Sequence, residues 1–170
     1  MPKINIQYFK TAYGELLLGE HDNKLIICDW RYRKMRDRID QRLQQNLKTS
    51  YTKKNTTLLD LTRQQLNEYF SNDRKEFGIP IKLIGTEFQQ QVWNGLIKIP
   101  YGKTINYLEL ATNISNSNAV RAVANANGAN AISIIIPCHR VIGSNGELAG
   151  YAGGVNTKKK LLNLEQSLFA

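Results

Sequence analysis

The chain has 170 residues, of which 42% are hydrophobic and 22% are charged, and its formal net charge is +9. This composition is typical of a folded protein with one or two domains, and it excludes a disordered tail. No apolar run approaches the roughly 20 residues that cross a membrane, and residues 1–5 begin no secretory signal, so we expect no membrane partner.

The positive charge favours a polyanionic partner, although many solvated surfaces carry similar charge. Its densest run, residues 31–38, fits either the exposed face of a helix or a patch that contacts phosphates. We expect a cytoplasmic protein, or a nuclear one if the source is a eukaryote.

The first third of the chain predicts three strands that form a small antiparallel sheet, at residues 4–8, 15–19 and 24–30. Two helices are predicted after them, one over residues 35–47 and one from Asp60, a good N-cap residue, through Phe70. Residues 78–81, Gly-Ile-Pro-Ile, break the helical pattern. We therefore place a boundary here and predict two domains, residues 1–80 and 81–170.

In the second domain, Thr86 is expected to cap a helix that ends before Pro100-Tyr101-Gly102. Two short helices follow, over residues 107–113 and 118–127, and then a buried strand over residues 132–136. Two short helices joined by a tight Asn/Ser turn fit a helix-turn-helix module, whose second helix meets DNA. The pattern fits an ordinary small helical bundle equally well.

The second short helix is rich in small residues and has one cation, Arg121, near its start. Small side chains permit close approach either to protein or to the groove of a nucleic acid. An arginine is poorly suited to a dry core without a partner, which favours the groove.

The pair Cys138-His139 follows the apolar run 134–136 and a proline. A thiol beside a histidine at a turn fixed by proline indicates a nucleophile with its base. The alternative is a buried, inert Cys138 beside a solvated His139. The other cysteine, Cys28, is predicted to be a core residue of a strand. With His21 it would supply two metal ligands at most, and a structural zinc site takes four, so we predict no metal.

An ordered series of motifs resembles the methylated-DNA–protein-cysteine methyltransferases, which repair 6-O-methylguanine and are consumed by the reaction. The match runs from about Gly85 to Glu165 without an obvious gap, and the first 80 residues match more loosely. The chain departs from the common pattern at Ala131, where many members have a proline. The motifs are Phe88-Gln89, Val92-Trp93, Ile99-Pro100-Tyr101-Gly102, Thr104 to Tyr107, Ala119 to Val123, Asn130, Pro137-Cys138-His139-Arg140-Val141, Gly150 to Gly154, and Lys160 to Leu162 with Glu165.

The resemblance implies an α/β fold of two parts. The N-terminal domain is expected to be ribonuclease-H-like, with a small β-sheet and helices. The C-terminal domain is expected to be winged helix-turn-helix-like, to bind DNA and to hold the active site. Some relatives bind zinc in the N-terminal domain, but that ligand set is missing here.

By the same resemblance, Cys138 is the thiolate that accepts the methyl group. His139 takes the thiol proton through an ordered water, and Glu165 orients the imidazole. Tyr107 donates a hydrogen bond or a proton to the departing base, although a tyrosine at a helix start usually packs on a core. The thioether that forms is a poor leaving group, so each protein molecule accepts one methyl group and needs no cofactor.

The expected partner is double-stranded DNA that carries alkylated guanine, bound by a monomer. The base must leave the duplex, and Arg121 is implied to take the place of the flipped nucleotide. The small residues of its helix suit a minor groove about 6 Å wide. The resemblance assigns DNA binding to Arg121, Ala122, Thr104 and Asn118, and the base pocket to Asn130, Tyr151, Ala152 and Pro137. The loop 150–154 also fits a plain surface hairpin.

Two alternatives remain open. A DNA-binding protein of the same fold recognises alkylated bases without removing the alkyl group, but relatives of that kind lack the cysteine that Cys138 matches. A cysteine hydrolase would use Cys138, His139 and Glu165, although it has no obvious use for a helix-turn-helix.

Overall fold

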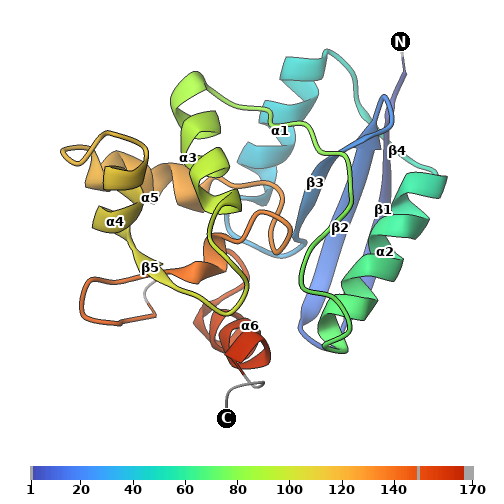
Figure 1. Cartoon of the computed structure of the whole chain (residues 1–170). Coiled ribbons are helices and arrows are strands. Elements are labelled where there is room, and N and C mark those ends of the chain that lie inside the picture. Colours follow the sequence, from blue (N-terminus) through green and yellow to red (C-terminus); the bar gives the residue numbers. More distant parts are fainter. Residues whose placement is uncertain (1, 149, 167–170) are drawn as a thin grey trace. The chain divides into compact units, whose positions relative to one another are not determined.

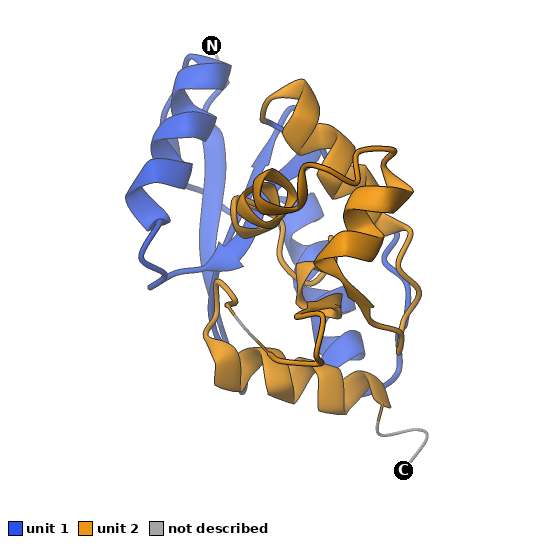
Figure 2. Cartoon of the chain, turned by 90° about the vertical axis from the view of Figure 1, so that its left-hand side faces the viewer, with its two compact units in different colours: residues 1–84 blue, residues 85–170 orange. Residues whose placement is uncertain are grey.

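The computed structural model describes residues 2–148 and 150–166. The chain divides into two compact units, Met1–Ile84 and Gly85–Ala170 (Figure 2). None of the helices in the described ranges is long and apolar enough to cross a membrane.

The first unit is built on a four-stranded sheet with the strand order β3-β2-β1-β4 (Figure 1). β1 (Ile4–Thr11), β2 (Gly14–His21) and β3 (Lys24–Trp30) are antiparallel neighbours, which confirms the three predicted strands. β4 (Tyr51–Lys53) pairs in parallel with β1. This strand was not predicted, because three residues are too few to show a periodic pattern.

The sheet is stabilised by apolar side chains on both faces of β2, one of its two inner strands. Leu17 and Leu18 point to opposite faces, and their exposed fractions are 2% and 0%. Gly19 allows β3 to lie close, since a Cβ atom there would be 2.6 Å from Cγ2 of Ile27. The turn Asp22-Asn23 has φ angles of 53° and 60°, which suit a tight hairpin between β2 and β3.

Two helices, α1 (Arg36–Leu47) and α2 (Thr57–Phe70), complete the first unit, and α2 packs against β2 and β3. The prediction that Asp60 caps α2 was wrong. The side chain of Thr56 accepts a hydrogen bond from the Leu59 N–H at 3.2 Å, and Asp60 lies in the first turn. Aspartate is favoured both as a cap and within the first turn of a helix, so its presence alone does not fix the start.

The second unit consists of short helices around two very short strands. α3 packs against both α4 and α5, and β5 pairs in parallel with β6. The described elements are α3 (Glu87–Ile97), β5 (Ile105–Asn106), α4 (Tyr107–Asn113), α5 (Val120–Gly128), the 3₁₀ turn η1 (Cys138–Arg140), β6 (Val141–Ile142) and α6 (Val155–Gln166).

Polar caps fix where the first two helices of this unit begin. Thr86 and Gln89 form a capping box at the start of α3, which confirms the predicted cap. Asn106 and Glu109 form a second capping box, so α4 begins at Tyr107 as predicted. α5 has no side-chain cap and begins at Val120, two residues later than predicted. The winged helix-turn-helix assignment stays a prediction.

The predicted strand over residues 132–136 was wrong, because this segment is a series of turns in which the Ile136 N–H donates to Ile132 O at 3.0 Å. Ile134 has a φ angle of +72°, which a β-branched residue rarely adopts. The side-chain amide of Asn130 donates to Ile132 O at 3.2 Å and to Ile136 O at 3.0 Å, and it accepts from the Ile132 N–H at 3.0 Å. Asn130 thus supplies hydrogen bonds that a neighbouring strand would otherwise give.

Candidate active site

The thiol of Cys138 is carried by the tight turn η1 rather than by the end of a strand. Pro137 precedes the turn and accepts a hydrogen bond from the Arg140 N–H at 3.0 Å, while the Cys138 N–H donates to Ile136 O at 2.8 Å. The exposed fractions of Cys138 and His139 are 3% and 0%. The alternative of a solvated His139 is therefore wrong.

His139 and Glu165 form a buried pair, although 25 residues separate them in the sequence. The Nε2 atom of His139 lies 2.6 Å from Oε2 of Glu165, and both side chains are fully buried. Burial raises the pKa of Glu165, but hydrogen bonds and charge interactions with His139 and Arg140 outweigh it and lower the pKa to about 2. The carboxylate is therefore ionised at neutral pH and accepts the hydrogen bond.

An ionised acceptor at Nε2 fixes the tautomer of the imidazole. Burial lowers the pKa of His139, and this effect outweighs the opposing interactions with Glu165, so the ring is neutral near pH 7. A neutral imidazole that donates from Nε2 has its lone pair on Nδ1. The Nδ1 atom is buried and has no hydrogen-bond partner among the described residues. Nδ1 of His139 is therefore the atom of the His139–Glu165 pair that can accept a proton.

Three more predicted site residues lie near this pair. Tyr107, at the start of α4, interacts with Cys138 electrostatically and with Asn127 by a hydrogen bond, and burial raises the pKa of its hydroxyl. The ring of Tyr151 meets the His139 ring edge to face, with centroids 6.4 Å apart. Asn130 is joined to Cys138 through Ile136, whose carbonyl accepts from both residues.

The predicted DNA-binding residues lie at the start of α5 and before β5. Arg121 and Ala122 are exposed in the first turn of α5, and Asn118 is exposed just before it. Thr104 is half-buried and immediately precedes β5. Of the remaining pocket residues, Pro137 is buried and Ala152 is half-buried in its loop.

Two buried, positively charged side chains near the site were not predicted as site residues from the sequence. Arg140 donates to both oxygens of Glu165, and Nζ of Lys158 donates to Val141 O at 2.6 Å. The spacing in α6 contains the signal for Lys158. The positions Lys158, Leu161, Leu162 and Glu165 follow the i, i+3, i+4, i+7 rule for one helix face, and all four are buried.

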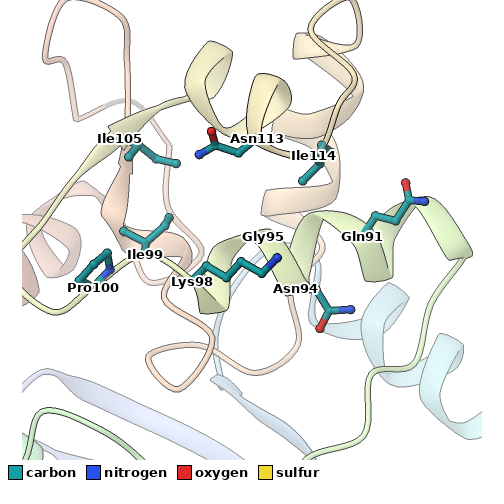
Figure 3. A pocket seen from close by; sticks show the side chains of 9 residues that line it. All are labelled: Gln91, Asn94, Gly95, Lys98, Ile99, Pro100, Ile105, Asn113 and Ile114. Carbon is teal, nitrogen blue, oxygen red and sulfur yellow. The ribbon is translucent and has the colours of Figure 1, made fainter.

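A separate pocket of about 570 Å³ lies beside the C-terminal half of α3 (Figure 3). Its lining combines polar side chains of α3 and the end of α4 with apolar residues. Its lining residues are Gln91, Asn94, Gly95, Lys98, Ile99, Pro100, Ile105, Asn113 and Ile114. None of the predicted site residues is among them, so this pocket is distinct from the Cys138 site.

The described residues contain no group of three or more His, Cys, Asp or Glu side chains placed to hold a metal ion. The geometry instead combines a thiol, a neutral imidazole and a fixed carboxylate. This arrangement suits a nucleophile with an oriented base.

Comparison with known proteins gives two matching family models. Residues 4–83 match the ribonuclease-like domain of 6-O-methylguanine DNA methyltransferase, and residues 87–167 match its DNA-binding domain. The constitutive methylated-DNA–protein-cysteine methyltransferase of Bacillus subtilis is 38% identical over 165 residues, which cover 95% of this chain and 96% of that protein. The chain belongs to the methylated-DNA–protein-cysteine methyltransferase family.

Other members of this family resemble the chain in sequence or in structure. The methylated-DNA–protein-cysteine methyltransferase of Mycobacterium tuberculosis is 54% identical over 103 residues. That alignment covers 61% of this chain and 62% of the relative, which is less than two thirds of the relative's length. The crystal structure of M. tuberculosis O6-methylguanine methyltransferase has a TM-score of 0.81 and 37% identity, covering 96% of this chain and 93% of that one. A crystal structure of the M. tuberculosis protein in complex with DNA has a TM-score of 0.82. The chain has the two-domain α/β architecture of the family.

Proposed function

We propose that this protein repairs DNA by transferring the methyl group of 6-O-methylguanine irreversibly to its own Cys138. The observation that carries the proposal is the buried His139–Glu165 pair, in which Nε2 lies 2.6 Å from Oε2. His139 directly follows Cys138 in the sequence, and the chain belongs to this family. In this proposal, the Nδ1 atom of the neutral His139 ring accepts the thiol proton, directly or through a water.

The reaction is a displacement at carbon. The sulfur–carbon bond forms as the bond between the methyl carbon and the guanine oxygen breaks, and the electron pair of that bond stays on the purine. The thiol proton passes to His139, and Glu165 stabilises the resulting imidazolium. The purine is neutralised by a proton, for which Tyr107 is the proposed donor. The product thioether has no second nucleophile to remove it, so the protein acts once.

DNA binding is assigned to the exposed start of α5. Arg121 fills the space of the flipped nucleotide, and Ala122 allows the helix to approach a minor groove closely. Thr104 and Asn118 are proposed to contact the same DNA. The extruded base lies against Asn130, Pro137, Tyr151 and Ala152. The protein acts as a monomer on a duplex that carries alkylated guanine.

The proposal is tested with duplex DNA that carries radiolabelled methyl groups on guanine. We expect the label to move to the protein, up to one equivalent, and Cys138→Ala to abolish the transfer. Cys28→Ala is the matched control and should transfer normally. Cys28 is a buried residue of β3, and burial, followed by the charge of Asp29, raises its thiol pKa strongly.

Label that stays on the DNA while the wild-type protein binds it tightly would support the non-catalytic alternative. Transfer of label to the Cys138→Ala variant would show that Cys138 is not the methyl acceptor.

A further inference from the structure

Arg140 is a buried arginine whose donors are divided between the catalytic carboxylate and the loop before β5. Its exposed fraction is 6%. Its Nε atom donates to Oε1 of Glu165 at 2.8 Å and its Nη2 atom to Oε2 at 3.1 Å. The third nitrogen, Nη1, donates to Ile99 O at 2.7 Å. The guanidinium therefore binds the carboxylate in a bidentate manner, with one nitrogen donating to each oxygen, and this fixes the plane of the carboxylate.

The loop between α3 and β5 contributes to the same carboxylate. The Gly102 N–H donates to Oε1 of Glu165 at 3.3 Å, and the ring of Tyr101 lies 5.6 Å from the centre of the Arg140 guanidinium. Arg140 thus holds the loop residues 99–102 and Glu165 in one arrangement. The loop leads directly through β5 to Tyr107.

Rotation of the Glu165 carboxylate would break the contact with His139. The Oε2 atom accepts both from His139 and from Arg140, so a rotation that carries Oε2 away from this position weakens both bonds. A lysine has a single nitrogen and cannot fix the plane of a carboxylate in this way.

We propose that Arg140 is a positioning residue for methyl transfer: its two hydrogen bonds to Glu165 orient the carboxylate toward His139, so that the imidazole is held where it accepts the thiol proton. This inference rests on the proposed function, because it concerns the base in that reaction. Arg140 touches neither the thiol nor the methyl group in this scheme and acts through Glu165.

The charges around His139 support the proposed role. Burial lowers its pKa, Glu165 raises it, and Arg140 and Lys158 lower it again. Removing the positive charge of Arg140 therefore favours the imidazolium, which cannot accept a proton. The other titratable residues near His139 include Cys138, Tyr107, Tyr151 and Glu165, and the substitution leaves all four in place.

The test measures the single-turnover rate of methyl transfer from pH 5.5 to pH 9. We expect Arg140→Met to slow transfer by at least about tenfold near pH 7, since an oriented base contributes more than this. Its acid limb should move to higher pH, so that part of the rate returns at pH 9. Arg140→Lys keeps the positive charge but loses the paired hydrogen bonds to the carboxylate. The acid limb of its pH–rate profile should therefore stay in place, while the maximal transfer rate falls.

Arg33→Met is the matched control. Arg33 lies in the first unit with a side chain that is 5% exposed, and its Nη1 atom donates to both oxygens of Asp29 at 3.2 and 3.1 Å. We expect it to lose stability without any change in the pH profile of transfer.

The outcomes separate the two hypotheses. If the wild-type protein and Arg33→Met transfer no methyl group, the proposed function fails. If they transfer it and the acid limb of Arg140→Met is unshifted, the inference about Arg140 fails while the function stands. If Arg140→Met does not fold, Arg140→Lys provides the test. A maximal transfer rate for Arg140→Lys equal to that of the wild type would overturn the inference.

Discussion

At the level of single residues, the buried carboxylate of Glu165 links the stability of the protein to pH. The ordinary pKa of 4.5 applies in the unfolded chain, and the folded value is about 2. The unfolded state binds more protons between these values, so this contribution is complete above about pH 4.5 and is lost as the pH falls toward 2. For His139, the folded pKa lies below its ordinary 6.5, so its contribution is lost as the pH falls below 6.5.

We therefore expect the free energy of unfolding to decrease in two stages as the pH is lowered from 7 to 3. The part due to Glu165 is at most about 3 kcal/mol. Urea denaturation at several pH values measures it, and Glu165→Gln should flatten the slope below pH 4.5. The exposed Glu76→Gln is the control, with an expected wild-type slope. An unaltered slope in Glu165→Gln would contradict the assignment.

The sequence predicted the candidate catalytic residues but not the buried residues that hold them. Cys138, His139 and Glu165 were expected from the resemblance, and the structure brings the last two within 2.6 Å. Arg140 stood in the same motif without a role, because a sequence does not show which carboxylate an arginine faces. Lys158 was detectable from its spacing in α6.

At the level of elements, the position of α5 depends on a buried hydrogen bond from α3. The indole Nε1 of Trp93 donates to Ala126 O at 2.9 Å, and the exposed fraction of Trp93 is 2%. α5 has no side-chain cap of its own. The packing of Trp93 therefore orients the helix that carries Arg121.

We expect Trp93→Phe to destabilise the protein by about 1–3 kcal/mol, through the lost hydrogen bond and the space left by the smaller ring. DNA affinity should fall more than in Trp30→Phe, a matched loss of a buried indole in the first unit. Thermal unfolding and fluorescence anisotropy with duplex DNA measure the two effects. Equal DNA affinities in the two variants would show that Trp93 does not orient α5.

The helices of the second unit were predicted more accurately than the segment around the candidate active site. α4 begins and ends where the sequence placed it, because Asn106 and Glu109 mark its start. The predicted strand over residues 132–136 was wrong because four isoleucines among five residues satisfy the strand pattern in any backbone conformation. The turns there depend on the side chain of Asn130, which a periodicity argument does not consider.

At the level of the whole molecule, the net charge of +9 predicts binding to DNA that depends strongly on salt. Contacts to phosphates are the same in damaged and undamaged duplexes. We therefore expect the affinities for methylated and unmethylated DNA to fall in parallel as salt increases. Anisotropy titrations with Cys138→Ala, which cannot react, measure both. A ratio of the two affinities that changes with salt would mean that charged contacts distinguish the lesion.

The boundary between the two units lies close to the boundary predicted from the sequence. The Gly-Ile-Pro-Ile segment suggested a boundary at residues 80 and 81, and the compact units meet at Ile84 and Gly85. The family models match residues 4–83 and 87–167. Glycine and proline mark the end of a helical pattern, but the last contacts of a domain depend on packing that the pattern does not show.

Peptide mass analysis after incubation with methylated duplex DNA tests the central claim most directly. The account predicts one added methyl group on the peptide that contains Cys138, no added methyl on the Cys28 peptide, and no further gain with excess DNA. An unmodified Cys138 peptide, with the methyl group still on the recovered DNA, would contradict it.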